Sequence, residues 1–237
     1  MHPLLIAILI IIFGSITGFV IWILLTFHPI KTQEIPLKDE KLRIFAIHDG
    51  NVNSYIIRTS TSTIMIDTGI GEKTLNGIKS LINSPFKANH IFLTHSDYDH
   101  AGNIEVYPEV PLSVSSGEVL LITKKAARFG RKHFNKFGRV DYEIINKETP
   151  ITVGDITILP VFTPGHTLGH TCYLVQDHYL FTGDTMRILP WGKQIPFLRI
   201  INMNHKQQLD SLRKLDDFIK THNVKFLGTA HSGIQWL

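Results

Sequence analysis

Thr94-His95-Ser96-Asp97-Tyr98-Asp99-His100 is the most informative stretch of this sequence, because four potential metal ligands lie within six residues. The apolar run from Asn89 to Thr94 predicts a short strand, and His95 lies at the end of this strand. Imidazole and carboxylate groups are the usual nitrogen and oxygen ligands of zinc and neighbouring divalent metals. A tight loop can turn alternate side chains inward, so the spacing can serve two adjacent metals. Taken alone, the stretch could also be a solvated polar turn.

Three further segments carry the same residue types at the ends of predicted strands. Residues 163–170 place His166 and His170 in a loop shaped by two glycines and a proline. Asp184 follows the next apolar run, and His231 follows the last one. Each residue alone could be an ordinary turn residue. Four such segments at four strand ends favour a shared ligand, and the sequence therefore predicts a metal site.

The four segments, taken in this order, resemble the motifs of the metallo-β-lactamase superfamily. Asp67-Thr68-Gly69 also matches the early acidic motif of that family, and the strand-like residues Asn53–Ile57 precede it. The resemblance extends over residues 42–231. It implies an α/β (α+β) fold, a four-layer αββα sandwich of the metallo-β-lactamase type. Because that fold serves many reactions, the motifs indicate the fold strongly and the substrate weakly.

The resemblance also implies two metal sites that share one carboxylate. The expected ligands are His95, Asp97 and His166 at the first site, Asp99, His100 and His231 at the second, and Asp184 between the two. Asp67 would brace the metal loops through hydrogen bonds. His170 is either a supporting residue behind the ligands or an ordinary packing residue.

Asp97 departs from the family pattern H-x-H-x-D-H, in which this position is usually a histidine. An anionic oxygen ligand is harder than an imidazole and favours iron or manganese over zinc. The replacement could also leave a mononuclear enzyme. We expect two divalent metal ions, with zinc as the first choice and iron or manganese as alternatives.

The resemblance and the ligand set predict a metal-dependent hydrolase that cleaves an ester, thioester, lactone or amide bond with a metal-bound hydroxide. Asp99 is the expected catalytic residue, which would position the hydroxide and carry its proton to the leaving group. The alternatives are a phosphodiesterase or nuclease, and a non-hydrolytic di-iron redox or metal-binding protein. A small molecule is the expected substrate and nucleic acid the less favoured one; the oligomeric state is left open. Residues Ile188–Ile201 could line the site with apolar surface, or they could form a membrane-facing or irregular connection.

A basic stretch separates Glu118 from Asp141, with no acidic residue inside it and aromatic residues between the later charges. A helix of this composition could contact an anionic substrate, a nucleic acid backbone or anionic lipid headgroups, or it could be a solvated face. Its basic residues are Lys124, Lys125, Arg128, Arg131, Lys132, Lys136 and Arg139.

The N-terminal residues 4–27 contain no charged side chain, which predicts a transmembrane helix. We therefore expect an anchor over residues 1–27, a tether over 28–41 and a metallo-β-lactamase-like domain over 42–237. Lys and Arg residues follow the apolar run closely, which favours a single-pass protein of the cell membrane with its domain on the cytoplasmic side. Cys172 is the only cysteine, so no disulfide can form within the chain.

Overall fold

Two β-sheets form the centre of this computed structural model, which describes residues 14, 16–21, 24, 27–37, 41–82, 86–128 and 135–237. The first sheet has seven strands in chain order: β1 (Gln33–Ile35), β2 (Arg43–His48), β3 (Asn53–Arg58), β4 (Thr63–Ile66), β5 (His90–Phe92), β6 (Leu112–Ser115) and β7 (Glu143–Ile145). The second has six, in the order β15 (Ile234–Trp236), β14 (Phe226–Thr229), β11 (Tyr179–Gly183), β10 (Thr171–Val175), β9 (Ile156–Phe162) and β8 (Ile151–Val153). A separate hairpin joins β12 (Met186–Ile188) to β13 (Gln194–Pro196).

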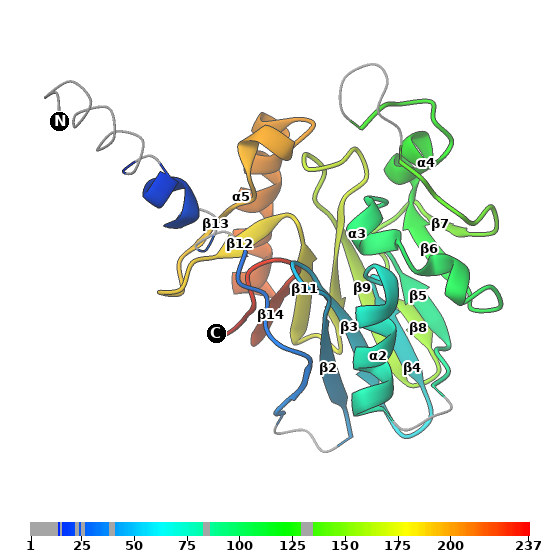
Figure 1. Cartoon of the computed structure of the whole chain (residues 1–237). Coiled ribbons are helices and arrows are strands. Elements are labelled where there is room, and N and C mark those ends of the chain that lie inside the picture. The colour runs from blue at the N-terminus through cyan, green and yellow to red at the C-terminus, as the bar shows by residue number, and fades with distance from the viewer. Residues whose placement is uncertain are drawn as a thin grey trace, which may run out of the picture.

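Helices cover the outer face of each sheet (Figure 1). The first sheet is covered by α2 (Gly71–Leu81), α3 (Tyr98–Ala101), η1 (Ile104–Val106) and α4 (Ser116–Ile122). Helix α5 (His205–Thr221) packs on the second sheet through Leu215, and the short turn η2 (Arg199–Ile201) precedes it. The resulting order of layers is helix, sheet, sheet, helix, which agrees with the fold that the motifs predicted.

Strand β2 shows why its residues are apolar on both faces. Successive side chains of a strand point to opposite faces of the sheet. Ile44 and Ala46 therefore pack between the two sheets, whereas Phe45 and Ile47 pack beneath α2. Because the layers bury both faces, the strand is a continuous apolar run without polar alternation.

Parallel strands bring the polar loops to one edge of the sandwich. In the first sheet β4, β5, β6 and β7 run parallel to one another, and in the second β11 runs parallel to β14. The carboxyl ends of parallel strands meet at the same edge, where the loops that follow them can carry a binding site. The loops after β4, β5, β11 and β14 contain the predicted acidic and histidine motifs.

The two long helices, α2 and α5, are segments in which apolar residues recur at helical spacing. Strands β8 and β9 form a hairpin over residues 151–162. Gly154 turns the chain there with a φ of +60°, a conformation that glycine adopts without steric cost.

The prediction of a single-pass membrane protein with its domain on the cytoplasmic side is wrong. Within the described ranges no helix combines the length and the apolar character needed to cross a bilayer. Most of the predicted anchor, residues 1–13, 15, 22, 23, 25 and 26, lies outside the described residues.

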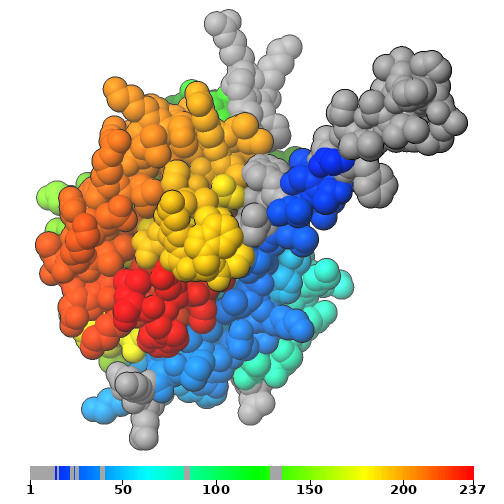
Figure 2. Space-filling model, turned by 90° about the vertical axis from the view of Figure 1, so that its left-hand side faces the viewer, coloured from blue at the N-terminus to red at the C-terminus, as the bar shows by residue number. Residues whose placement is uncertain are grey.

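The predicted tether also differs from the structure, because it adds a strand to the first sheet. Strand β1 pairs antiparallel with β2, and the N–H of His28 donates to the carbonyl of His231 at 2.9 Å. Ile30 and Asn53 exchange two hydrogen bonds at 2.8 and 2.9 Å. Figure 2 shows this blue segment lying beside the red C-terminal residues and the yellow hairpin region.

Candidate metal centre

Three groups of histidine and carboxylate side chains meet at the loop edge of the sandwich. Within each group the potential ligand atoms lie within 4.8 Å of one another. The groups are His95–Asp97–His166, Asp99–His100–His231 and His95–His100–Asp184. Every residue that the sequence assigned to a metal site is therefore present in one cluster.

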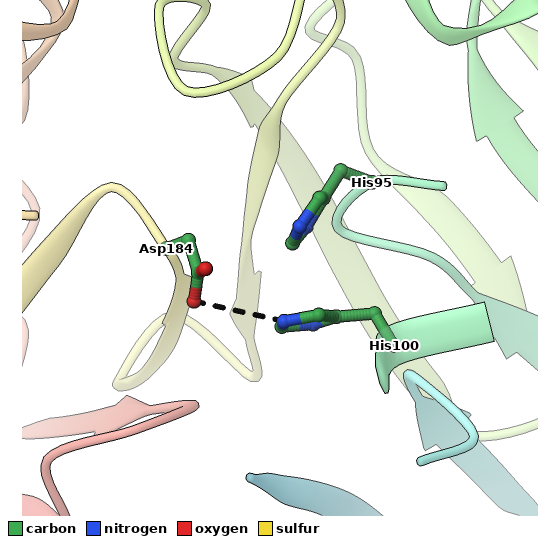
Figure 3. Close-up of side chains that lie close together, drawn as sticks. All are labelled: His95, His100 and Asp184. Carbon is green, nitrogen blue, oxygen red and sulfur yellow. Dashed lines mark ion pairs between the residues drawn. The ribbon is translucent and has the colours of Figure 1, made fainter. Parts of the chain in front are cut away.

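Asp184 lies between the first two groups. Its Oδ2 is 3.3 Å from His166 Nε2, and its Oδ1 is 3.4 Å from His231 Nε2 and 3.6 Å from His100 Nε2. Figure 3 shows the imidazoles of His95 and His100 and the carboxylate of Asp184 directed toward one another. The two carboxylate oxygens face different groups, which is the arrangement expected of a bridging ligand.

Outer hydrogen bonds fix which ring nitrogen of each histidine faces the cluster. Nδ1 of His100 contacts Asp67 Oδ2 at 2.8 Å, Nδ1 of His166 contacts Asn202 Oδ1 at 3.0 Å, and Nδ1 of His231 contacts the carbonyl of Asn51. Each Nδ1 meets an acceptor and so carries the proton. Each Nε2 therefore faces the cluster, as in histidines that bind metals.

The cluster contains buried polar atoms that a cation would satisfy. Nε2 of His95, Nε2 of His100 and Oδ1 of Asp184 are buried and have no hydrogen-bond partner in the described part of the chain. Buried polar atoms are rarely left unpaired, because the lost hydration is costly. These atoms are lone-pair donors, so imidazole nitrogen and carboxylate oxygen together fit a divalent cation such as zinc, iron or manganese.

Electrostatics in the metal-free cluster favour ion pairs. Burial would lower the pKa of His100, but the carboxylates of Asp99, Asp67 and Asp184 raise it to about 9. Burial would raise the pKa of Asp184, but the surrounding His231 and His100 hold it well below the usual range. The pKa of His231 is raised as well, so protons on His100 and His231 balance the carboxylates, and a divalent cation would displace them.

Asp67 braces the loop that carries the first histidine. It accepts hydrogen bonds from the backbone N–H and the hydroxyl of Thr94, both at 2.8 Å, besides contacting His100. Its φ of +58° is unusual for a residue other than glycine, and the surrounding bonds hold it there. These contacts support the structural role that the sequence assigned to it.

His170 lies behind the ligands and contacts the backbone of one of them. Its Nε2 accepts the N–H of Asp184 at 3.0 Å, and its Nδ1 lies 3.0 Å from the hydroxyl of Thr163 and 3.1 Å from that of Thr185. Both ring nitrogens are therefore engaged, and burial holds its pKa well below the usual range. Of the two roles that the sequence left open, the geometry favours support of Asp184.

Glu118 is a buried residue of the site that the sequence analysis missed. Oε2 accepts the backbone N–H and hydroxyl of Ser96 at 2.8 and 2.6 Å, and Oε1 accepts the N–H of Gly169 at 3.0 Å and the Thr167 hydroxyl. The carboxylate thereby joins the loop of residues 94–100 to the loop of residues 163–170. Gly117 marks the same contact, since a Cβ there would lie 2.6 Å from the Cα of Gly169.

The predicted basic helix is not present as one face. Helix α4 ends at Ile122, and Lys124 takes a φ of +59°, which turns the chain out of the helix. Lys124, Lys125 and Lys136 are exposed, whereas Arg139 is buried against Asp141 and backbone carbonyls. Arg131 and Lys132 lie outside the described residues.

Arg128 belongs to the cluster itself. Its side chain is buried, and its Nε lies 2.8 and 2.9 Å from the two carboxylate oxygens of Asp97. The Nη2 atom lies 3.0 Å from His166 Nε2. Asn135 donates to the same Asp97 carboxylate at 3.1 Å.

Aromatic side chains cover one flank of the cluster. Phe197 stacks on the ring of His231 with centroids 5.2 Å apart and meets His166 edge-on at 5.4 Å. Phe27 meets His231 edge-on at 5.4 Å. Part of the segment 188–201 thus forms an apolar wall, as one of the two sequence interpretations expected.

Comparison with known proteins agrees with this geometry. The family model described as the metallo-beta-lactamase superfamily matches residues 48–218. A hydroxyacylglutathione hydrolase of Buchnera aphidicola is 30% identical over 149 residues, which cover 61% of this chain and 51% of that protein. Thioesterase pkgB of Emericella nidulans is 28% identical over 137 residues, which cover 56% of this chain and 35% of that protein. The chain thus spans about half or less of the length of these relatives.

A solved structure shows the same fold. The metallo-beta-lactamase from Pontibacter korlensis superposes with a TM-score of 0.65 and 19% sequence identity, over 87% of this chain and 94% of that one. At this identity the likeness concerns the fold alone. Together with the family model, which covers most of the chain, it establishes that this protein belongs to the metallo-β-lactamase superfamily.

Proposed function

We propose that this chain is a metal-dependent hydrolase that cleaves an ester, thioester, lactone or amide bond of a small molecule. The observation that carries the proposal is the convergence of His95 Nε2, His100 Nε2 and Asp184 Oδ1, which are buried and unpaired among the described residues. The names of two relatives, a hydroxyacylglutathione hydrolase and a thioesterase, support an acyl compound as substrate. Esters and thioesters are therefore the first substrates to test.

The proposed ligands are those of the two groups with Asp184 between them. Bound divalent cations would supply a nucleophile at neutral pH and positive charge beside the developing oxyanion. Zinc, iron and manganese all suit this mixture of imidazole and carboxylate donors. His170, Asp67 and Glu118 would hold the ligands in place through the hydrogen bonds described above.

Asp99 is the carboxylate best placed to meet a substrate. Its side chain is 44% exposed, against 17% for Asp97 and 4% for Asp184. Burial would raise its pKa, but His100 and His231 lower it to about 2. Asp99 is therefore ionised at neutral pH, where it can orient an attacking water by accepting its hydrogen and pass a proton to the leaving group.

Phosphodiester cleavage is the weaker candidate. Its support was a basic helix that could follow a phosphate backbone. Of those residues, some face solvent, Arg139 pairs with the exposed Asp141, and Arg128 belongs to the cluster, so the described residues form no continuous basic face.

The proposal is tested by turnover of the metal-loaded chain on chromogenic ester, thioester, lactone and phosphodiester substrates, with and without a chelator. We expect chelator-sensitive hydrolysis of an acyl substrate. Asp99→Asn should lower kcat by about 10²–10⁴-fold, the usual contribution of a positioned proton carrier. Asp217→Asn, on the exposed face of α5, is the matched control and should leave kcat unchanged. A metal-loaded chain that cleaves only phosphodiesters, or none of these substrates, would contradict the proposal.

A further inference from the structure

Arg128 contacts two of the three members of the His95–Asp97–His166 group. Its guanidinium spans Asp97, through two Nε contacts at 2.8 and 2.9 Å, and His166, through Nη2 at 3.0 Å. The residue is 3% exposed, so these contacts are made in the interior rather than in solvent. Hydrogen bonds between a guanidinium and a carboxylate are among the strongest in proteins, because both partners are charged.

The contact with His166 uses the lone pair that a cation would need. Nδ2 of Asn202 donates to the carbonyl of Phe197 at 3.3 Å, which leaves its Oδ1 as the acceptor for His166 Nδ1 at 3.0 Å. The proton of His166 therefore lies on Nδ1, and Nε2 has a single lone pair. That lone pair can accept from Arg128 or bind a cation, and it cannot do both.

The charge of Arg128 also opposes binding of a cation at Asp97. In the family pattern this position is a neutral imidazole, whereas here the carboxylate faces a permanently charged guanidinium. The first group thus already contains a positive charge beside its anionic ligand, and a divalent cation placed there would be repelled by Arg128.

The second group has no such partner in the described part of the chain. The ion pairs of Asp99 are with His100 at 3.8 Å and with His231 at 3.4 Å. A neutral imidazole can bind a cation through its nitrogen lone pair, whereas the guanidinium of an arginine stays charged at any accessible pH.

We propose that Arg128 is a built-in competitor of the first cation. The chain binds one divalent cation tightly at Asp99, His100, His231 and Asp184. A second cation binds between His95, Asp97 and His166 only when the Arg128 side chain leaves Asp97 and His166. The inference rests on the proposed metal site and is independent of the reaction.

The test is a titration of the chelator-treated full chain with Zn²⁺, followed by calorimetry and by metal analysis after gel filtration. The wild-type chain should retain one equivalent and bind a second at least about 100-fold more weakly, a gap of about 2.7 kcal/mol. Arg128→Gln should narrow that gap by at least about tenfold. Lys125→Gln is the matched control, because it removes the same charge three residues away on an exposed side chain and should leave the gap unchanged.

A second variant keeps the test decisive if Arg128→Gln does not fold. Asp97→His removes the carboxylate that holds the guanidinium and should also yield two retained equivalents. Wild-type protein that binds two equivalents with affinities within about tenfold of each other would overturn the inference while leaving the proposed function intact. The inference would also be overturned if both variants bound the second Zn²⁺ equivalent with the wild-type affinity. A chain that binds no cation at all would contradict the proposed function itself.

Discussion

The two halves of the cluster are built from similar side chains and differ in what lies behind them. His95, Asp97 and His166 surround the guanidinium of Arg128, whereas Asp99, His100 and His231 face one another and Asp184. The carboxylates also differ in access, since Asp99 is more exposed than Asp97. The motif therefore indicates which potential ligand atoms are present. The surrounding side chains determine whether those atoms bind a cation or a positively charged side chain.

The largest effect is expected at the residue that the two halves share. Asp184→Asn replaces one of the two oxygens that face the groups by an amide nitrogen, which cannot bind a cation. We expect the affinity for the tighter cation to fall by more than about 100-fold and turnover to fall with it. Calorimetry with Zn²⁺ measures this loss, and Asp177→Asn, in a turn remote from the cluster, serves as its control. An unchanged affinity would show that Asp184 is outside the metal site.

Glu118 joins the loops that carry His95, Asp97 and His166, so its replacement should weaken the fold around the cluster. Glu118→Gln presents an amide group to a pocket of four donors, so some of them lose their acceptor. The free energy of unfolding should fall by about 2–4 kcal/mol. Urea denaturation of the metal-free chain measures it, with the exposed Glu109→Gln as control. A loss below about 0.5 kcal/mol would contradict the buried bridging role.

The second half should make the metal-free chain sensitive to alkaline pH. The folded chain raises the pKa of His100 from 6.5 to about 9, so it binds this proton more tightly than the unfolded chain does. The resulting stability is complete below pH 6.5 and is lost as pH rises toward 9, by about 1–3 kcal/mol. Denaturation at pH 6 and pH 9 measures the difference, and His100→Gln should reduce it. Stability that rises between these pH values would refute the assignment.

The smallest effect is expected at the aromatic flank of the second half. Phe27→Ala removes one ring beside His231, and a ring pair contributes about 0.5–1.5 kcal/mol. KM for a substrate with an apolar acyl chain should therefore rise by about threefold to tenfold, with kcat little changed. The same variant tested on a short acetyl ester is the control. Equal changes with both substrates would mean that Phe27 supports the fold rather than the substrate.

Much of the fold and most of the cluster could be predicted from local pattern. Apolar runs that end in histidine or aspartate marked the strand ends, and helical spacing marked α2 and α5. The structure brings all seven predicted ligands together, while their role as ligands stays a prediction. The membrane localisation was wrong, because the described residues contain no helix that is long and apolar enough to cross a bilayer. The described part of the basic stretch is not helical, because α4 ends at Ile122, before the first of its charges, and Lys124 turns the chain with a positive φ.

The family, the order of the predicted metal-binding motifs and the presence of Asp97 in place of the usual histidine can be read from the sequence alone, since each depends on residues close together in the chain. The contacts that those residues make are seen only in the tertiary structure. Arg128 reaches Asp97 across 31 positions and His166 across 38, and Glu118 reaches Gly169 across 51. The physical reason is that local periodicity encodes burial and strand ends, whereas the partner of a buried charge depends on how distant segments pack.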